Sequence, residues 1–191
     1  MLRTFLPISV SLSIIAACSV ALGYTGGPIR IRVEGYDSST KKVYYRLHRF
    51  DESGLPPEVY SLRLNSTSPN RPFRERSLEV AADPSYQRWS LLTRRLEKLG
   101  GESSFKLEVE EASENAGVDS TSGTPVSLHR IHVRLRSGSK SGKVDTTAYC
   151  EALVTVKALY RIPGRKERLS ILSFIGRAYG CEEVDVPVLL R

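Results

Sequence analysis

Period-two alternation of apolar and polar residues runs through most of this chain and restricts it to a β-rich fold. The longest example lies in the C-terminal third, where one face of residues 150–162 carries Cys150, Ala152, Val154, Val156, Ala158, Tyr160 and Ile162. A Pro-Gly turn at 163–166 follows, and residues 169–181 alternate in the same way. Such alternation is typical of half-buried strands. We therefore expect a long hairpin between residues 150 and 181.

This hairpin predicts a disulfide bond. If it is centred between Arg165 and Lys166, Cys150 lies directly opposite Cys181, so the alternation and the cysteines agree on the register. By the loop-entropy estimate the bond contributes about 3 to 4 kcal/mol to stability. The alternative is a pair of buried free thiols, and a Cα separation beyond about 7 Å would exclude the bond.

The N-terminus has the pattern of a secretory signal. Arg3 is the only charged residue before an apolar run that extends from Phe5 to Val20. Ala21 and Gly23 then supply the two small residues that a signal peptidase needs. We expect a signal peptide over residues 1–23 and one globular domain over 24–191. A retained membrane anchor is the alternative, but Pro7 and three serines interrupt the apolar run. The predicted location is therefore the periplasm, the outer membrane or the exterior.

The same segment admits a second interpretation. The run Ile15-Ala16-Ala17-Cys18 resembles the lipobox of bacterial lipoproteins, in which the cysteine becomes the lipidated first residue. The resemblance implies that Cys18 tethers the domain to a membrane through a short glycine-containing linker. Residues 21–23 offer a competing cleavage site, so lipoprotein and freely soluble protein both stay open. Either outcome leaves Cys150 and Cys181 as the remaining pair of the three cysteines.

The first half of the domain predicts a meander followed by a helix. Alternation over 29–34, 42–50 and 59–64 indicates three antiparallel strands. Asp83 as N-cap, Pro84 at the first helical position and a Gly-Gly stop at 100–101 predict a helix over 84–99. Its apolar stripe includes Trp89, which we interpret as the anchor that packs the helix on the sheet rather than as a ligand platform.

Two further strands carry opposite charges. Residues 104–111 present Lys106, Glu108 and Glu110 on one face, and residues 129–136 present Arg130, His132, Arg134 and Arg136. We expect these faces to pair across a loop at 112–125, which would partly neutralise the basic side. His129 and His132 point to opposite faces of their strand, so they do not predict a metal pair.

Several short motifs resemble functional sites but lack the features that those sites require. The segment 137–143 lacks the spacing and the following helix of a phosphate loop, and Ser137 with Lys140 lacks the companion motifs of penicillin-recognising enzymes. We interpret this segment as a flexible basic turn. Asp51 and Glu52 suit turn or capping roles rather than an acid pair. Asn65 begins a glycosylation sequon that matters only in a eukaryotic source.

The predicted fold is therefore a β-rich α+β domain, a mainly antiparallel sheet of about seven strands with one amphipathic helix packed on it. No cofactor or metal site is expected. The net charge of +7 favours an anionic partner such as a component of the cell envelope, whereas nothing in the sequence indicates nucleic-acid binding.

We expect a non-enzymatic exported protein that acts in binding or assembly. The alternative is a small hydrolase whose site is built from loops at 51–58, 65–77 and 112–125. A third hypothesis is pairing of the final strand with a partner, because Pro187 suggests that this strand lies at an edge.

Overall fold

The computed structural model describes residues 27–49, 57–64, 72–78, 84–118, 123, 125–177 and 181–191. The signal segment with Cys18, the Asp51-Glu52 pair and the sequon at Asn65 lie outside these residues, so the predictions made for them stay predictions. Within the described residues the elements in chain order are β1 (Ile29–Asp37), β2 (Lys42–Arg49), β3 (Glu58–Arg63), β4 (Phe73–Arg74), the 3₁₀ turn η1 (Arg76–Leu78), α1 (Pro84–Thr93), β5 (Gly100–Gly101), β6 (Lys106–Val118), β7 (Pro125–Ser137), β8 (Lys140–Tyr149), β9 (Val154–Arg161), β10 (Arg168–Arg177) and β11 (Glu182–Leu190).

The described strands form two sheets. The larger has the order β4-β3-β2-β1-β11-β10-β9-β5, and the smaller is β6-β7-β8. The β-rich character, the meander β1-β2-β3 and the antiparallel hairpins are as predicted. The large sheet is mixed, because β1 runs parallel to β11 at the pair Ile29 and Val184. The chain therefore folds into more strands than expected, with one parallel joint.

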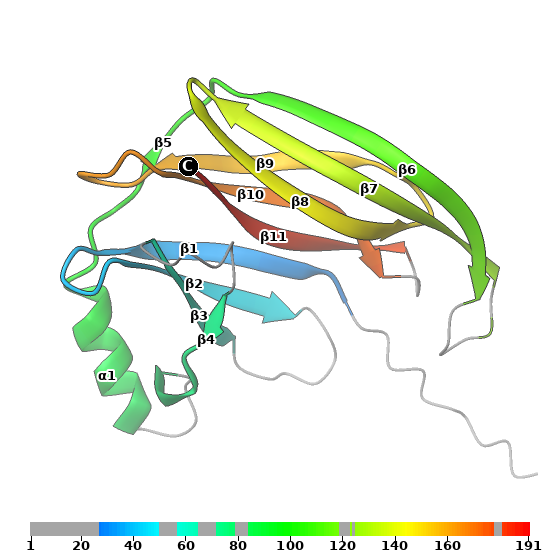
Figure 1. The fold of residues 1–191 in the computed structure, drawn as a ribbon. Coiled ribbons are helices and arrows are strands. Elements are labelled where there is room, and N and C mark those ends of the chain that lie inside the picture. Colours follow the sequence, from blue (N-terminus) through cyan, green and yellow to red (C-terminus); the bar gives the residue numbers. More distant parts are fainter. Residues whose placement is uncertain are drawn as a thin grey trace, which may run out of the picture.

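Three layers of strands are stacked in the molecule, with β6–β8 above, β9–β11 in the middle and β1–β4 below (Figure 1). The large sheet bends at the β1–β11 joint, where the Ile31 N–H donates to the Asp185 carboxylate at 3.0 Å. This bend lets the two halves of the sheet pack on each other. Tyr45 and Leu62 of the lower layer accordingly share one hydrophobic cluster with Leu169 and Ile171 of β10.

Strand β10, at the centre of the middle layer, is buried on both faces over residues 169–174. Leu172 and Phe174 point up from β10 into a second cluster with Ile131 and Leu135 of the small sheet. Leu169 points down to the lower layer. Complete burial of both faces explains why β10 reads Leu-Ser-Ile-Leu-Ser-Phe, with short apolar and small residues on each side.

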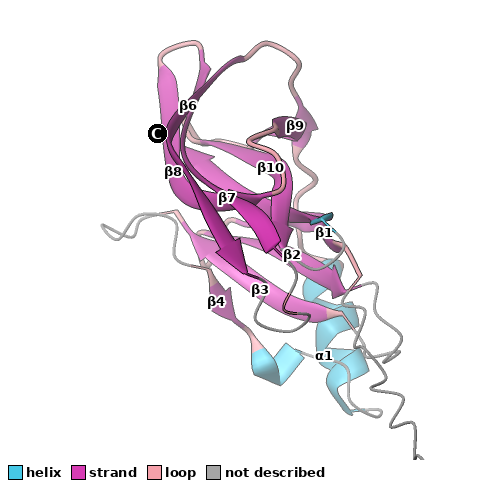
Figure 2. Ribbon diagram, turned by 90° about the vertical axis from the view of Figure 1, so that its right-hand side faces the viewer, coloured by secondary structure: helices cyan, strands magenta, loops and turns pink. Residues whose placement is uncertain are grey.

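Helix α1 covers the outer side of the lower layer, on the side away from β6–β8 (Figure 2). As predicted, Trp89 and Leu92 anchor it by packing on Tyr44 and Val59. The predicted end at residue 99 is wrong, since the helix stops at Thr93. Glu97 instead exchanges two backbone hydrogen bonds with Tyr36 of β1, at 2.8 and 2.9 Å.

The Gly-Gly pair predicted as a helix stop forms the short edge strand β5 against β9. The predicted edge role of the last strand is also wrong. β11 lies inside the sheet between β1 and β10. Pro187 is tolerated there because β1 pairs with β11 only at Ile29, so no ladder partner on that side needs a Pro187 N–H.

The loop predicted at 112–125 is mostly strand, because β6 continues to Val118 and β7 begins at Pro125. This end of the hairpin extends beyond the other layers (Figure 1). Residues 112–118 are therefore largely exposed on both faces and have no reason to alternate. A β-bulge between Glu111 and Ser113 also breaks the period.

The Cys150–Cys181 disulfide is confirmed, with the two Cα atoms 6.0 Å apart. The register that predicted it is wrong. Arg161 pairs with Arg168, which places the centre of the hairpin between Gly164 and Arg165, and a bulge at Lys157 shifts the ladder again. The bond instead links the segment that follows β8 to the residue that precedes β11.

Candidate functional site

The outer face of the small sheet gathers exposed charged side chains, and its inner face is apolar. On β7, Ile131, Val133 and Leu135 point inward and are buried, whereas Arg130, Arg134 and Arg136 point outward and are exposed. Strict alternation on a sheet with one packed side produces this division. The predicted pairing of acidic and basic faces is confirmed, because Glu108 lies opposite Arg134 and Glu110 opposite His132.

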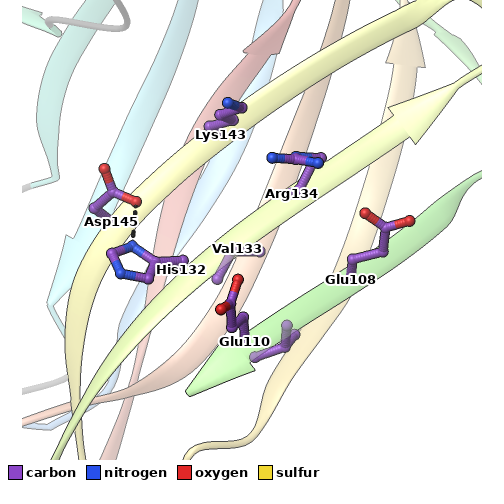
Figure 3. Close-up of a pocket in the computed structure, with 8 residues that line it drawn as sticks. Glu108, Glu110, His132, Val133, Arg134, Lys143 and Asp145 are labelled. Atoms are coloured by element: carbon purple, nitrogen blue, oxygen red, sulfur yellow. Dashed lines mark hydrogen bonds and ion pairs between the residues drawn. The ribbon is translucent and has the colours of Figure 1, made fainter. Parts of the chain in front are cut away.

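Strand β8 completes two rows of side chains that cross the three strands. One row is Glu108, Arg134 and Lys143, and the next is Glu110, His132 and Asp145. The rows line a shallow hollow of about 130 Å³ on this face (Figure 3). In the second row the His132 Nδ1 and Asp145 Oδ1 atoms are 2.7 Å apart.

Positive charge dominates the end of the face next to the β7–β8 turn. We call Lys106, Arg134, Arg136 and Lys143 the basic face. Glu108 is the carboxylate among them, at 2.9 Å from the Lys106 ammonium and 3.9 Å from the Arg136 guanidinium. The hydrogen bond from Lys106 lowers the pKa of Glu108, so this carboxylate stays ionised at neutral pH.

Arg134 and Lys143 are neighbours on adjacent strands and carry the same charge. Over the part of the chain that the structure describes, neither has an ion-pair partner within 4.0 Å. Like charges directly opposite each other in a sheet are destabilising. An arrangement that keeps two such cations side by side attracts an anion that contacts both.

A larger cleft of about 400 Å³ opens where the lower and middle layers separate, and it includes Arg30, Lys157 and Asp185. Its cations are already paired. Glu183 lies 2.5 Å from Arg30 and 3.3 Å from Lys157, and Asp185 also contacts Arg30. This cleft therefore has less charge to offer a ligand than the basic face.

The hollow in the small sheet contains a histidine and carboxylates but no hydroxyl or thiol in its lining. It therefore lacks the combination of hydroxyl, histidine and carboxylate that would favour the hydrolase hypothesis. Of the loops proposed for that hypothesis, 112–118 is strand, and 51–56 and 65–71 lie outside the described residues.

The structure also places Ser137 and the two histidines of β7, which the sequence singled out. Ser137 ends β7, and a two-residue turn at 138–139 joins it directly to β8. The interpretation of 137–143 as a flexible turn is therefore wrong for residues 140–143, which belong to β8. The Ser137 hydroxyl donates to Glu102 at 3.2 Å. The two histidines point to opposite faces as predicted, with His129 buried and His132 exposed.

The sequence reasoning missed Lys143 and Asp145, because the segment that contains Lys143 was taken as a turn. The alternation of Lys143 and Asp145 with Val144 was the signal that could have placed them on a strand.

Comparison with known proteins gives no relative. No protein-family model matches the chain, and neither a curated protein nor a solved structure matches it. No helix among the described residues is both long and apolar enough to cross a membrane.

Proposed function

We propose that the protein is exported and that it binds an anionic polymer of the cell envelope or exterior through the basic face. The observation that carries the proposal is the pair Arg134 and Lys143, two neighbouring cations without an ion-pair partner among the described residues. A solvated charge face is the competing interpretation. Against it, Lys106 and Arg136 contact Glu108 within 4.0 Å, whereas Arg134 acts on this carboxylate only at longer range and Lys143 forms no ion pair among the described residues.

The spacing of the basic face favours a polymer over a single small ion. Arg134 and Arg136 are two residues apart on one strand, which separates them by about 6.8 Å along it. Lys143 lies across the neighbouring strand, about 5 Å from Arg134 at the level of Cβ. Cations distributed at this spacing along and across two strands match negative groups repeated along a chain.

Export is the second part of the proposal, and two independent features support it. Residues 1–23 have the pattern of a secretory signal. The disulfide between Cys150 and Cys181 is typical of proteins that mature in an oxidising compartment. The mature protein then begins either at a lipidated Cys18 or at Tyr24. Intact mass of the protein from its native host distinguishes these forms, and a chain that retains Met1 would contradict export by cleavage.

The binding proposal is tested by titrating dextran sulfate into the protein and measuring affinity by fluorescence anisotropy. The test variant is Arg134→Glu with Lys143→Glu. The matched control is Arg95→Glu with Lys98→Glu, which changes the net charge equally but alters exposed residues that follow α1. We expect the test variant to bind about tenfold or more weakly, which corresponds to a loss of about 1.4 kcal/mol.

The control variant is expected to bind nearly as the wild type does, and added salt should weaken the wild type because exposed charges are screened. Equal losses in both variants would show that net charge alone drives binding. That result would contradict a localised site.

A further inference from the structure

A second polar cluster lies on the inner face of the small sheet, and a β-bulge creates it. Residues 111 and 114 of a regular strand would point to opposite faces. The register shift in β6 instead places Glu111 opposite Ile131 and Glu114 opposite His129, so Ala112 is the additional residue. Glu111, Glu114 and the inward-pointing His129 therefore share one face.

These three side chains bring their ligand atoms together. One carboxylate oxygen from each glutamate and one ring nitrogen of His129 all lie within 4.8 Å of one another. The His129 Nδ1 atom is 2.6 Å from Glu111 Oε1. Both atoms donate an electron pair, so a contact this short needs a proton or a metal ion between them. His129 is only 7% exposed, whereas both glutamates are exposed and have room to rotate.

The second nitrogen of His129 is held in the orientation that a metal ligand requires. Nε2 lies 3.3 Å from the backbone carbonyl oxygen of Cys150, which can only accept a hydrogen bond. Nε2 therefore carries a proton, and Nδ1 is the nitrogen directed at the carboxylates. Metal-ligating histidines characteristically donate their other N–H to a carboxylate or backbone carbonyl. The disulfide holds Cys150 and thereby this carbonyl.

We propose that Glu111, Glu114 and His129 bind a divalent transition-metal ion, for which Zn²⁺ is the best match. An imidazole with two carboxylates suits Zn²⁺, whereas Ca²⁺ and Mg²⁺ take oxygen ligands. Tetrahedral zinc bonds of about 2.0 to 2.2 Å place ligand atoms roughly 3.3 to 3.6 Å apart. His129 Nδ1 and Glu111 Oε1, now 2.6 Å apart, would separate to this distance when the exposed Glu111 side chain rotates. Three protein ligands leave one position for water or for a ligand from a partner.

The test is calorimetric titration of Zn²⁺ alone into the protein with its disulfide formed and Cys18→Ser, so that no free thiol competes. Glu114→Gln removes one ligand at an exposed position and should not disturb folding. The matched control is Glu110→Gln, an exposed glutamate on the outer face of the same strand. We expect one Zn²⁺ per wild-type chain, with affinity reduced about tenfold or more in Glu114→Gln and unchanged in the control.

A second variant separates this site from His132, the exposed histidine on the outer face. His132→Gln removes the outer histidine beside Asp145 and should leave Zn²⁺ affinity unchanged. Absence of Zn²⁺ binding, or binding that Glu114→Gln does not weaken, would overturn the proposal and leave His129 and Glu111 as a proton-bridged pair. Binding lost in His132→Gln would also overturn it, because the metal would then lie on the outer face.

Discussion

Truncating one leucine on each face of β10 tests the three-layer architecture. Leu169 points to the lower layer and is 0% exposed, and Leu172 points to the small sheet and is 1% exposed. Because neither side chain reaches solvent, each Leu→Ala change removes a full set of core contacts and leaves a cavity. Measured costs for such changes are about 3 to 5 kcal/mol. We expect a loss of this size for each variant separately.

The assay is urea unfolding followed by the fluorescence of Trp89, the single tryptophan of the chain. The two leucines belong to different clusters, so their effects should add, and a total of about 6 to 10 kcal/mol would consume most of the stability of an ordinary domain. The double variant should therefore be largely unfolded. Leu153→Ala, at a position 58% exposed, is the control and should change stability by less than about 0.5 kcal/mol.

A sheet packed on one side only would give a different result. In that case one of the two leucines would face solvent, and its truncation would cost less than about 1 kcal/mol. That outcome would refute the reasoning, because no layer would then cover the corresponding face of β10.

Three other predictions concern covalent, electrostatic and helical contributions. Replacing Cys150 and Cys181 by serine should lower the free energy of unfolding by about 3.7 kcal/mol, as the loop-entropy relation gives for their sequence separation of 31, and equal stability would contradict this. Burial raises the pKa of Glu102, but hydrogen bonds from Arg168 and Ser137 outweigh it and lower the pKa below the ordinary value of 4.5. The stability that ionised Glu102 contributes is therefore present above pH 4.5, and it is lost as the pH falls through the lowered pKa of the folded protein. Glu102→Gln should therefore cost about 1 kcal/mol at neutral pH, with the difference from wild type shrinking in acid, and a constant difference in urea unfolding would contradict it. Trp89→Ala should lower the free energy of unfolding by about 3 kcal/mol, because Trp89 is 7% exposed and anchors α1. Urea unfolding followed by circular dichroism measures this change, and a loss below about 1 kcal/mol would show that the helix is not packed there.

Local signals in the sequence predicted the individual elements well. The alternation around Val43 and Tyr45 gave the meander, and Pro84 gave the start of the helix. Opposite charges on 106–110 and 130–136 gave the pairing of β6 with β7. These features depend on neighbours in sequence or on one hairpin, and the physical rules for them act over short distances.

Long-range features could not be derived in the same way. The bend between β1 and β11 joins residues 155 positions apart, and nothing local marks it. The bulge at Lys157 redirects Ala158 and Tyr160 to the lower layer, which a strict period of two cannot show. The Glu111, Glu114 and His129 cluster likewise depends on a bulge, in a segment that the sequence predicted as a loop from residue 112 onward.

The location of polyanion binding is the central claim, and chemical-shift mapping tests it most directly. Isotopically labelled protein would be titrated with short dextran sulfate while backbone amide signals are recorded. We predict that the largest shifts fall on Arg134, Arg136 and Lys143 and their neighbours on β7 and β8. Shifts concentrated at the cleft around Arg30, or spread evenly over all basic residues, would contradict the assignment of the basic face as the binding surface.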